Sequence, residues 1–197
     1  GCGMSDTDAR LAFERHATSK IKQANDLFHL TTMGFRGEAL ASIAAIANIT
    51  LTTRKQEDEL GTKIQLSGSE VVLQEHTQCA VGSSFLVKNL FFNVPARRKF
   101  LKADNTEFRH INEEFTRVAM TRPDIHFELI HNNTHIHNLP AGNLKQRIVG
   151  IFGKSYNTKL IPVETNTTLV NIKGYAGTTE LAKKRQGEQY FFVNNRY

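Results

Sequence analysis

The chain has 197 residues, of which 40% are hydrophobic and 22% are charged, a composition typical of a soluble globular protein. No apolar run approaches the ~20 residues needed to cross a bilayer, which argues against a membrane-spanning protein. The formal net charge of +6 gives mild support to an anionic partner such as nucleic acid or a nucleotide. The length allows one large domain or two small ones.

The two cysteines, Cys2 and Cys79, do not form a disulfide framework, and the sequence shows no signal-peptide pattern. We therefore expect a reducing, intracellular compartment. The chain starts at Gly1 without an initiating methionine and closes on residues 190–197, which resemble a strand that runs into a turn. Both features lead us to expect a piece of a longer protein.

The first elements in chain order are a helix and a loop. Ser5 and Asp8 stand at capping-box spacing before an apolar stripe, which predicts a helix over residues 6–16. Residues 15–21 combine hydroxyl groups with positive charge, so they predict a loop suited to phosphate or ribose oxygens, or equally a helix end whose basic residues complement the dipole. Residues 25–29 are expected to form a short helix or turn.

The segment Gly34-Phe35-Arg36-Gly37-Glu38-Ala39-Leu40 leads into the apolar helical run 41–47. Glycine has no Cβ, so the backbone at Gly34 and Gly37 can take positive φ and approach a ligand closely. The first turn of the helix leaves its N–H groups without internal partners, and a phosphate fits such a place. A G-x-x-G segment by itself is more often a plain loop entering a core helix, so its surroundings must decide.

In the rest of the first half, apolar and polar residues alternate with period two at residues 49–53, 62–66, 71–73 and 84–87. This pattern predicts antiparallel strands over a helical layer. Pro95 ends the following segment, and a helix is expected over residues 96–101. A domain boundary is expected close to this point.

The second half predicts another α/β unit. We expect a helix over residues 107–120 that Pro123 stops, a hairpin of residues 127–131 and 135–139 around Asn132-Asn133-Thr134, and a helix over residues 143–152. Strands are expected at residues 160–163, 169–174 and 190–193.

Few residues outside the glycine segment suggest a catalytic, metal-binding or ligand-binding role. His131, His135 and His137 could share a strand face and hold a metal, but no further ligand stands beside them, so a solvated strand face is favoured. The basic clusters Arg97-Arg98-Lys99 with Lys102 and Lys183-Lys184-Arg185 suit either phosphodiester oxygens or a solubilising surface.

Four segments together resemble the N-terminal region of the MutL family of DNA mismatch repair ATPases, within the GHKL superfamily that also holds gyrase. They are Gly1-Cys2-Gly3, residues 17–21, residues 34–43 and residues 93–101. Residues 190–196 also resemble the family's Phe-Val-Asn-x-Arg segment. The resemblance implies an α+β fold: a two-layer α/β sandwich of the GHKL ATPase type, incomplete, over residues 1–102, and a smaller α/β domain of the ribosomal-protein/topoisomerase type, C-terminally incomplete, over residues 103–197.

The resemblance also implies an ATP site. Gly1 and Gly3 would belong to the adenine-binding turn, Thr18, Ser19 and Lys20 to a lid over the nucleotide, and Ser83 to a position near adenine where the family has threonine. The phosphate-binding segment would be Gly34, Phe35, Arg36, Gly37, Glu38, Ala39 and Leu40, and DNA would contact Lys183, Lys184 and Arg185.

The family's general-base glutamate, its Mg²⁺-binding asparagine and a lysine that reaches the γ-phosphate correspond to no position in these 197 residues. We therefore expect no catalytic residue in this chain, and negligible ATP hydrolysis by it alone. The implied partners are DNA, the mismatch-recognition protein MutS, a downstream endonuclease or helicase, and a second copy in an ATP-dependent homodimer, in the bacterial cytoplasm and without a membrane. The alternatives are a nucleic-acid-binding module without nucleotide chemistry and the ATPase domain of a type II topoisomerase subunit.

Overall fold

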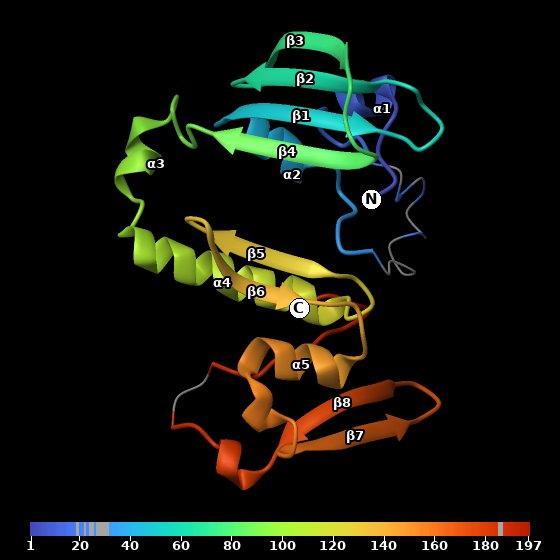
Figure 1. The fold of residues 1–197 in the computed structure, drawn as a ribbon, viewed down its shortest axis with the longest axis vertical. Helices are drawn as coiled ribbons and strands as arrows, with labels where there is room; N and C mark the ends of the chain where they lie inside the picture. Colours follow the sequence, from blue (N-terminus) through green and yellow to red (C-terminus); the bar gives the residue numbers. More distant parts are fainter. Residues whose placement is uncertain (19, 22, 24–25, 27–31, 185–186) are drawn as a thin grey trace. The chain divides into compact units, whose positions relative to one another are not determined.

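The computed structural model describes residues 1–18, 20–21, 23, 26, 32–184 and 187–197. The chain divides into two compact units, Gly1–Lys102 and Ala103–Tyr197, which are described separately below (Figure 1). The domain types assigned above to these ranges stay predictions. In the described part of the chain, no helix is long and apolar enough to cross a membrane.

A four-stranded antiparallel sheet forms the first unit, with the order β3-β2-β1-β4. Its strands are β1 (Asn48–Arg54), β2 (Gly61–Ser67), β3 (Glu70–Thr77) and β4 (Gly82–Lys88). All four strands expected from the alternating pattern are present. Each extends one to four residues beyond the expected range at one or both ends, because hydrogen bonding between strands continues past the apolar positions that define the pattern.

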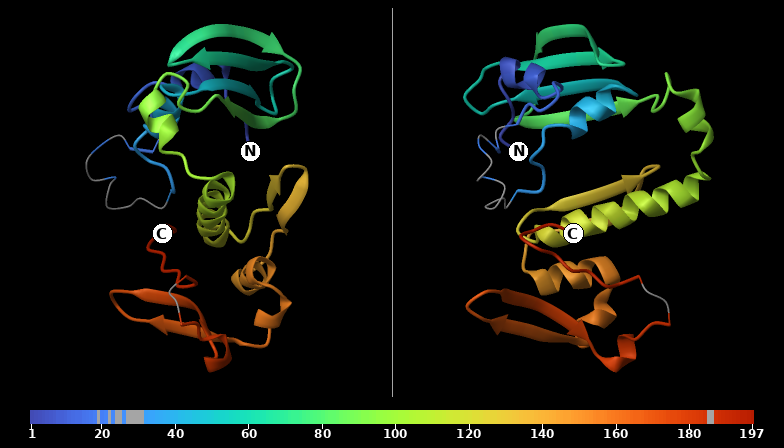
Figure 2. Two further views of the ribbon diagram at one scale, coloured as in Figure 1. Left: turned by 90° about the vertical axis from the view of Figure 1, so that its left-hand side faces the viewer. Right: turned by 180° about the vertical axis from the view of Figure 1, so that it is seen from behind.

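The helices α1 (Asp6–Leu11) and α2 (Ala39–Ala44) lie on one face of this sheet, as both views of Figure 2 show. Side chains alternate across a strand, so every second residue of β1 and β2 points to these helices. The buried cluster joins residues of both helices with the two central strands: Ala9, Ala44, Ile49, Leu51, Ile64 and Leu66. The hydrophobic core of the first unit therefore lies between the helices and the middle of the sheet.

Helix α1 begins as expected, because the Ser5 side chain accepts a hydrogen bond from the Asp8 N–H at 3.1 Å. The expected end at His16 is wrong. After Leu11 the chain forms tight turns in which Phe13 and Glu14 bond three residues back, and His16 takes a φ of 64°. The side chain of Phe13 thereby packs against the core.

Helix α2 is shorter than the predicted run to Ala47. One loop supplies donors to the carbonyls at its end: the Phe91 N–H donates to the Ile46 carbonyl at 2.7 Å, and the Asn93 side-chain amide donates to the Ala45 carbonyl at 2.8 Å. These bonds replace the next helical turn. The loop that carries Phe91 and Asn93 leads to the short helix α3 (Pro95–Lys99), which Pro95 opens.

The second unit starts with the long helix α4 (Asp104–Thr121) and the hairpin of β5 (Phe127–His131) and β6 (Thr134–Leu139). The expected hairpin is confirmed, because Asn132 and Asn133 both take positive φ, 48° and 62°, as a two-residue turn requires. Helix α5 (Leu144–Phe152) is capped by Asn143 and Gln146 in a reciprocal capping box. A second hairpin of β7 (Leu160–Asn166) and β8 (Asn171–Gly177) follows, with 3-10 turns at Lys154–Tyr156 and Thr179–Leu181.

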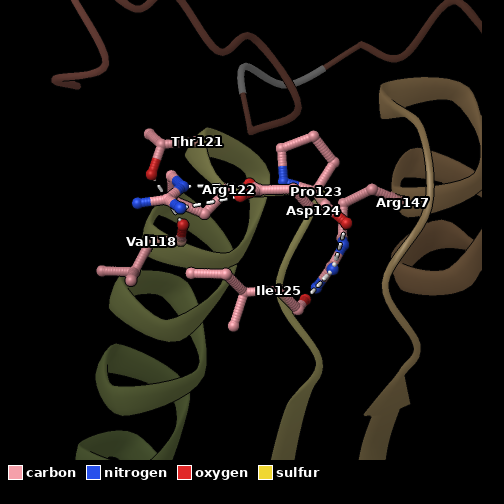
Figure 3. A network of polar contacts seen from close by, with 7 residues as sticks. All are labelled: Val118, Thr121, Arg122, Pro123, Asp124, Ile125 and Arg147. Atoms are coloured by element: carbon pink, nitrogen blue, oxygen red, sulfur yellow. Dashed lines mark hydrogen bonds and ion pairs between the residues drawn. The ribbon is translucent and has the colours of Figure 1, made fainter. Parts of the chain in front are cut away.

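Arg147 of α5 is buried, with 3% of its surface exposed, and connects three segments of the second unit. Its Nη2 donates to the carbonyl oxygens of Pro123 at 3.0 Å and of Ile125 (Figure 3). It also donates to the Pro140 carbonyl oxygen at 3.3 Å. The guanidinium also lies 5.2 Å from the centre of the Phe127 ring. One side chain therefore fixes the turn after α4 and the turn before α5.

The prediction of a strand over residues 190–193 is wrong. A single bridge joins Val193 to Arg196 across Asn194 and Asn195, whose φ values of 49° and 63° make a tight turn. In the described part of the second unit, the sheets contain only the two hairpins, so this segment pairs with no strand. Aromatic contacts hold it instead: the Tyr190 ring lies beside Phe152, Phe192 and Tyr197, and Arg117 lies 4.2 Å from the centre of the Tyr197 ring.

Candidate functional site

The turn at Gly3 lies against the end of β1. Gly3 has a φ of 74°, and a Cβ at this position would overlap the carbonyl oxygen of Arg54 and lie 2.8 Å from the nitrogen of Lys55. Only glycine fits such an approach. Gly1 lies beside Gly82, since a Cβ on Gly82 would stand 3.5 Å from the Gly1 carbonyl oxygen, whereas a Cβ on Gly1 would meet open space.

A buried hydroxyl connects this turn to β4. The Oγ1 of Thr53, a residue with no exposed surface, accepts from the Met4 N–H at 2.9 Å and lies 3.1 Å from the Gly82 carbonyl oxygen. The Ser83 Oγ lies 2.8 Å from the same Oγ1. If the Thr53 hydroxyl donates to the Gly82 carbonyl, the Ser83 hydroxyl can donate to the Thr53 Oγ1. The Thr53 hydroxyl then uses its single donor and both of its acceptor positions. The structure thus brings the predicted residues Gly1, Gly3 and Ser83 together.

Thr53 is a residue of this site that the sequence analysis missed. Its signal was present: Ile49, Leu51 and Thr53 alternate on the buried face of β1, and the third position carries a hydroxyl where the pattern favours an aliphatic side chain. A buried hydroxyl needs a partner. The partners come from residues 49 and 30 positions away in the chain, which no local pattern indicates.

The second glycine segment is fixed at Gly37. Gly37 has a φ of 66°, and a Cβ there would lie 2.6 Å from the carbonyl carbon of Ala17. The Gly37 carbonyl accepts from the His16 N–H at 3.1 Å, and the His16 imidazole lies 3.3 Å from the Glu38 carboxylate. Residues 16–17 and 37–38 therefore lie side by side, which joins the start of the predicted lid to the predicted phosphate-binding segment.

Gly34 differs from the expectation. Its φ is not in the left-handed region, and a Cβ would meet no atom of the described residues within 4 Å. Its carbonyl accepts from the Thr32 hydroxyl at 3.0 Å. Of the two glycines at which a positive φ was possible, only Gly37 takes one.

The remaining residues of the phosphate-binding prediction lie at the start of α2. Arg36 is exposed and lies 5.6 Å from the centre of the Phe35 ring. Ala39 and Leu40 open the helix, and Glu38 stands at its N-cap without a side-chain bond to the first turn. Backbone donors of that turn therefore lack a side-chain acceptor of the usual kind.

The predicted lid residues are described in part. Thr18 accepts from the Lys20 N–H at 3.1 Å through its Oγ1, and Lys20 is exposed. Ser19 lies outside the described residues, and so do most positions of the turn expected over residues 25–29.

Of the predicted DNA-contacting residues, Arg185 lies outside the described part of the chain. Lys183 forms an ion pair with Glu188, whose other carboxylate oxygen accepts from the Tyr156 hydroxyl at 2.6 Å. The bond to Glu188 raises the pKa of the Lys183 ammonium. Burial alone would raise the pKa of Glu188, but the bonds from Lys183 and Tyr156 lower it overall. Lys184 is exposed and forms no ion pair with a described residue.

The three histidines do not form a solvated strand face. The His131 ring stacks on Phe108 with centroids 4.0 Å apart, and the His137 ring stacks on Phe115 at 5.6 Å while its Nε2 lies 2.8 Å from the Asn112 Oδ1. Two of them therefore pack on α4. Among the described residues, no group of three metal-ligating side chains is present.

Comparison with known proteins gives matches over the whole chain. The chain is 58% identical over all 197 residues to the DNA mismatch repair protein MutL of Bacteroides fragilis. It is 57% identical to that of Flavobacterium johnsoniae and 53% identical to that of Porphyromonas gingivalis. The chain belongs to the MutL family. It spans only 32% of the length of the Bacteroides fragilis MutL, so activities of the whole protein are treated below as proposals.

Two further comparisons agree with membership of the MutL family. Residues 148–197 match the family model of the DNA mismatch repair protein, C-terminal domain. The fold resembles that of the Aquifex aeolicus MutL ATPase domain complexed with ADP, with a TM-score of 0.68, 26% identity and coverage of 89% of this chain and 65% of the other. The mixed α+β fold is thereby confirmed as MutL-like, whereas the type of the second domain stays a prediction.

Proposed function

We propose that this MutL chain forms the nucleotide-facing part of an ATP-driven switch in DNA mismatch repair. The observation that carries the proposal is the pair of close backbone approaches at Gly3 and Gly37. They occur at the positions that the resemblance assigns to the adenine and the phosphates. Since a side chain would collide with the Arg54 backbone or the Ala17 backbone, glycine at both places lets these two segments pack closely and holds them in position for a ligand.

Different residues of the chain would bind different parts of the nucleotide. Gly1, Gly3 and Ser83 would shape the adenine end, with Thr53 holding the turn at Gly3 to β4. The segment from Gly34 to Leu40 would offer backbone N–H groups to the phosphates, with Mg²⁺ held by a residue outside these 197. When bound, ATP supplies a γ-phosphate whose presence or loss orders or releases nearby loops in switch proteins.

Thr18, Ser19 and Lys20 would then act as a lid that follows the nucleotide state, because Ala17 touches Gly37 directly. We further propose that residues 1–102 are a partial GHKL ATP-binding domain and residues 103–197 a transducer-like second domain. Closure of the lid would favour an N-terminal homodimer that meets MutS, a downstream endonuclease or helicase, and DNA in the cytoplasm. Lys184 is the better candidate for the DNA contact, because Glu188 already pairs with Lys183.

Calorimetric titration of the 197-residue polypeptide with ADP and a non-hydrolysable ATP analogue tests the proposal. Gly37→Ala is expected to weaken binding at least tenfold, since a Cβ collides with Ala17 and the φ is left-handed. Gly174→Ala is the matched control and is expected to bind like the unchanged chain, because Gly174 lies in β8, outside the proposed site, and its Cβ would meet no described atom within 4 Å.

Two results would reject the proposal: no nucleotide binding by the folded chain, or equal effects of the two alanine variants. Nucleic-acid binding with no nucleotide binding would favour the alternative module without nucleotide chemistry.

A further inference from the structure

His16 lies beside the segment that is proposed to face the phosphates. Its N–H donates to the Gly37 carbonyl at 3.1 Å. The next residue, Ala17, stands directly against Gly37, where a Cβ would lie 2.2 Å from the Ala17 carbonyl oxygen. His16 itself takes a φ of 64°, a left-handed conformation that is uncommon for residues other than glycine. The backbone therefore fixes His16 next to Gly37 and Glu38.

The His16 side chain lies close to one carboxylate. Its Nδ1 is 3.3 Å from the Glu38 Oε1, and the two side chains keep 76% and 47% of their surface exposed. The other charged side chains in the described parts of residues 14–20 and 34–40 are Glu14, Arg15, Lys20 and Arg36. Within the part of the chain that the structure describes, none of these four forms an ion pair with His16 or Glu38. The imidazole is thus the described group that is placed to balance the Glu38 charge.

Glu38 puts a negative charge next to the proposed phosphate-binding segment. It follows Gly37 directly, and its side chain makes no capping bond to α2. A carboxylate repels the phosphates of a nucleotide, whereas an imidazolium beside it offsets that charge. The charge of histidine ordinarily changes between pH 5 and 8. Since an exposed ion pair contributes little to stability, the main expected effect of this pair is on the charge beside Gly37 rather than on the fold.

We propose that His16 and Glu38 form a pH-sensitive pair that tunes nucleotide binding. Protonated His16 offsets the Glu38 carboxylate and favours the anionic ligand. Neutral His16 leaves the carboxylate unbalanced, so binding weakens as the pH rises. His16 acts through Glu38 and does not itself touch the phosphates. The inference rests on the proposed nucleotide switch and adds to it a regulation by pH.

Calorimetric titration of the 197-residue chain with ADP at pH 6 and pH 8 tests the proposal. The phosphates of ADP also titrate in this range, so the unchanged chain is compared with variants under the same conditions. We expect the ratio of the affinities at pH 6 and pH 8 to be about two- to fivefold larger for the unchanged chain than for a variant that lacks the pair. Because the coupling of proton and nucleotide is reciprocal, such a variant should also take up fewer protons when ADP binds.

Two variants separate the roles of the carboxylate and the imidazole. Glu38→Gln keeps the shape of the side chain and removes its charge, so we expect tighter binding than in the unchanged chain at pH 8 and similar binding at pH 6. His16→Asn removes the titrating ring at a φ that asparagine tolerates, so we expect weaker binding at pH 6 and similar binding at pH 8.

His110→Asn is the matched control. His110 also lies beside a glutamate, with its Nδ1 3.9 Å from the Glu113 Oε2, and both side chains are exposed. This pair belongs to α4 of the second unit, outside the proposed nucleotide site. We expect His110→Asn to keep the pH dependence of the unchanged chain.

A second measurement needs no nucleotide. NMR spectra of the isotope-labelled chain from pH 6 to pH 8 follow the amide signal of Gly37, whose carbonyl accepts the His16 N–H. We expect this signal to shift with pH in the unchanged chain and in His110→Asn, and to stay in place in His16→Asn.

Three results would overturn the inference: a Gly37 signal that does not respond to pH, an ADP affinity of the unchanged chain with the same pH dependence as that of His16→Asn, or a pH dependence that Glu38→Gln retains in full. Each of the last two, seen with a chain that binds ADP, rejects the regulation alone. A folded chain that binds no ADP at either pH rejects the proposed function and this regulation together.

Discussion

The Ser83 hydroxyl lies 2.8 Å from the buried Thr53 hydroxyl, which also accepts the Met4 N–H at 2.9 Å. Two hydroxyls thus join the start of the chain to the start of β4. Ser83 is exposed, whereas Thr53 has no exposed surface. The buried Thr53 is expected to determine the stability of the fold, whereas the exposed Ser83 can face a ligand.

Thr53→Val keeps the shape of the side chain but removes the hydroxyl. The Met4 N–H and the Gly82 carbonyl then lose their partner, so we expect a loss of about 1–3 kcal/mol in the free energy of unfolding. Urea denaturation measures this. Thr53→Ser retains the hydroxyl and is expected to recover most of the loss, and Ser83→Ala is expected to change stability by less than Thr53→Val. A Thr53→Val protein as stable as the original would contradict the role assigned to the network.

Gly3→Ala tests the close approach of the N-terminal turn to β1. A Cβ at residue 3 collides with the Arg54 carbonyl at a left-handed φ, so the turn must move. We expect lower thermal stability and nucleotide affinity reduced at least tenfold. Gly174→Ala is the control, because Gly174 lies outside the proposed site and its Cβ would meet no described atom within 4 Å. Equal affinities of the two variants in calorimetric titration would show that the turn does not shape the site.

Arg147→Met tests the buried arginine of the second unit. The carbonyls of Pro123, Ile125 and Pro140 would lose their common donor, so we expect a loss of at least about 2 kcal/mol in unfolding free energy. Arg122→Met breaks only the exposed pair with Asp124, whose contact at 2.7 Å is screened by water, so the change in unfolding free energy is expected to be smaller than for Arg147→Met. Denaturant titration compares the two. A larger effect at Arg122 would refute this assignment.

His137 is expected to make stability depend on pH. Burial lowers the pKa of its imidazole below the unfolded value of about 6.5. The unfolded chain then binds the proton more readily, so stability is complete above pH ~7 and falls as the pH drops through 6.5 towards the folded pKa. His137→Phe retains a ring to stack on Phe115 but cannot titrate. Urea denaturation from pH 8 to 5 should show a flatter profile for this variant, and an unchanged profile would exclude His137 as the cause.

The sequence alone determined the features that depend on near neighbours in the chain. Period-two alternation indicated all four strands of the first sheet, Asn132-Asn133 indicated the turn of a hairpin, and Ser5 indicated the start of α1. The resemblance of four segments to known sequences indicated the MutL family, which the matches over the full chain confirm. The strands, the hairpin turn and the helix start follow from backbone sterics and side-chain periodicity within about ten residues.

Only the tertiary structure decided which of these residues act together. It selected Gly37 rather than Gly34 as the glycine that must have no side chain, because Ala17 lies against it. It added Thr53 and packed two histidines on α4. Within the described part of the chain, it also left residues 190–193 without a strand partner. Each result depends on contacts between segments distant in sequence, and these form only when burial of apolar surface brings the segments together.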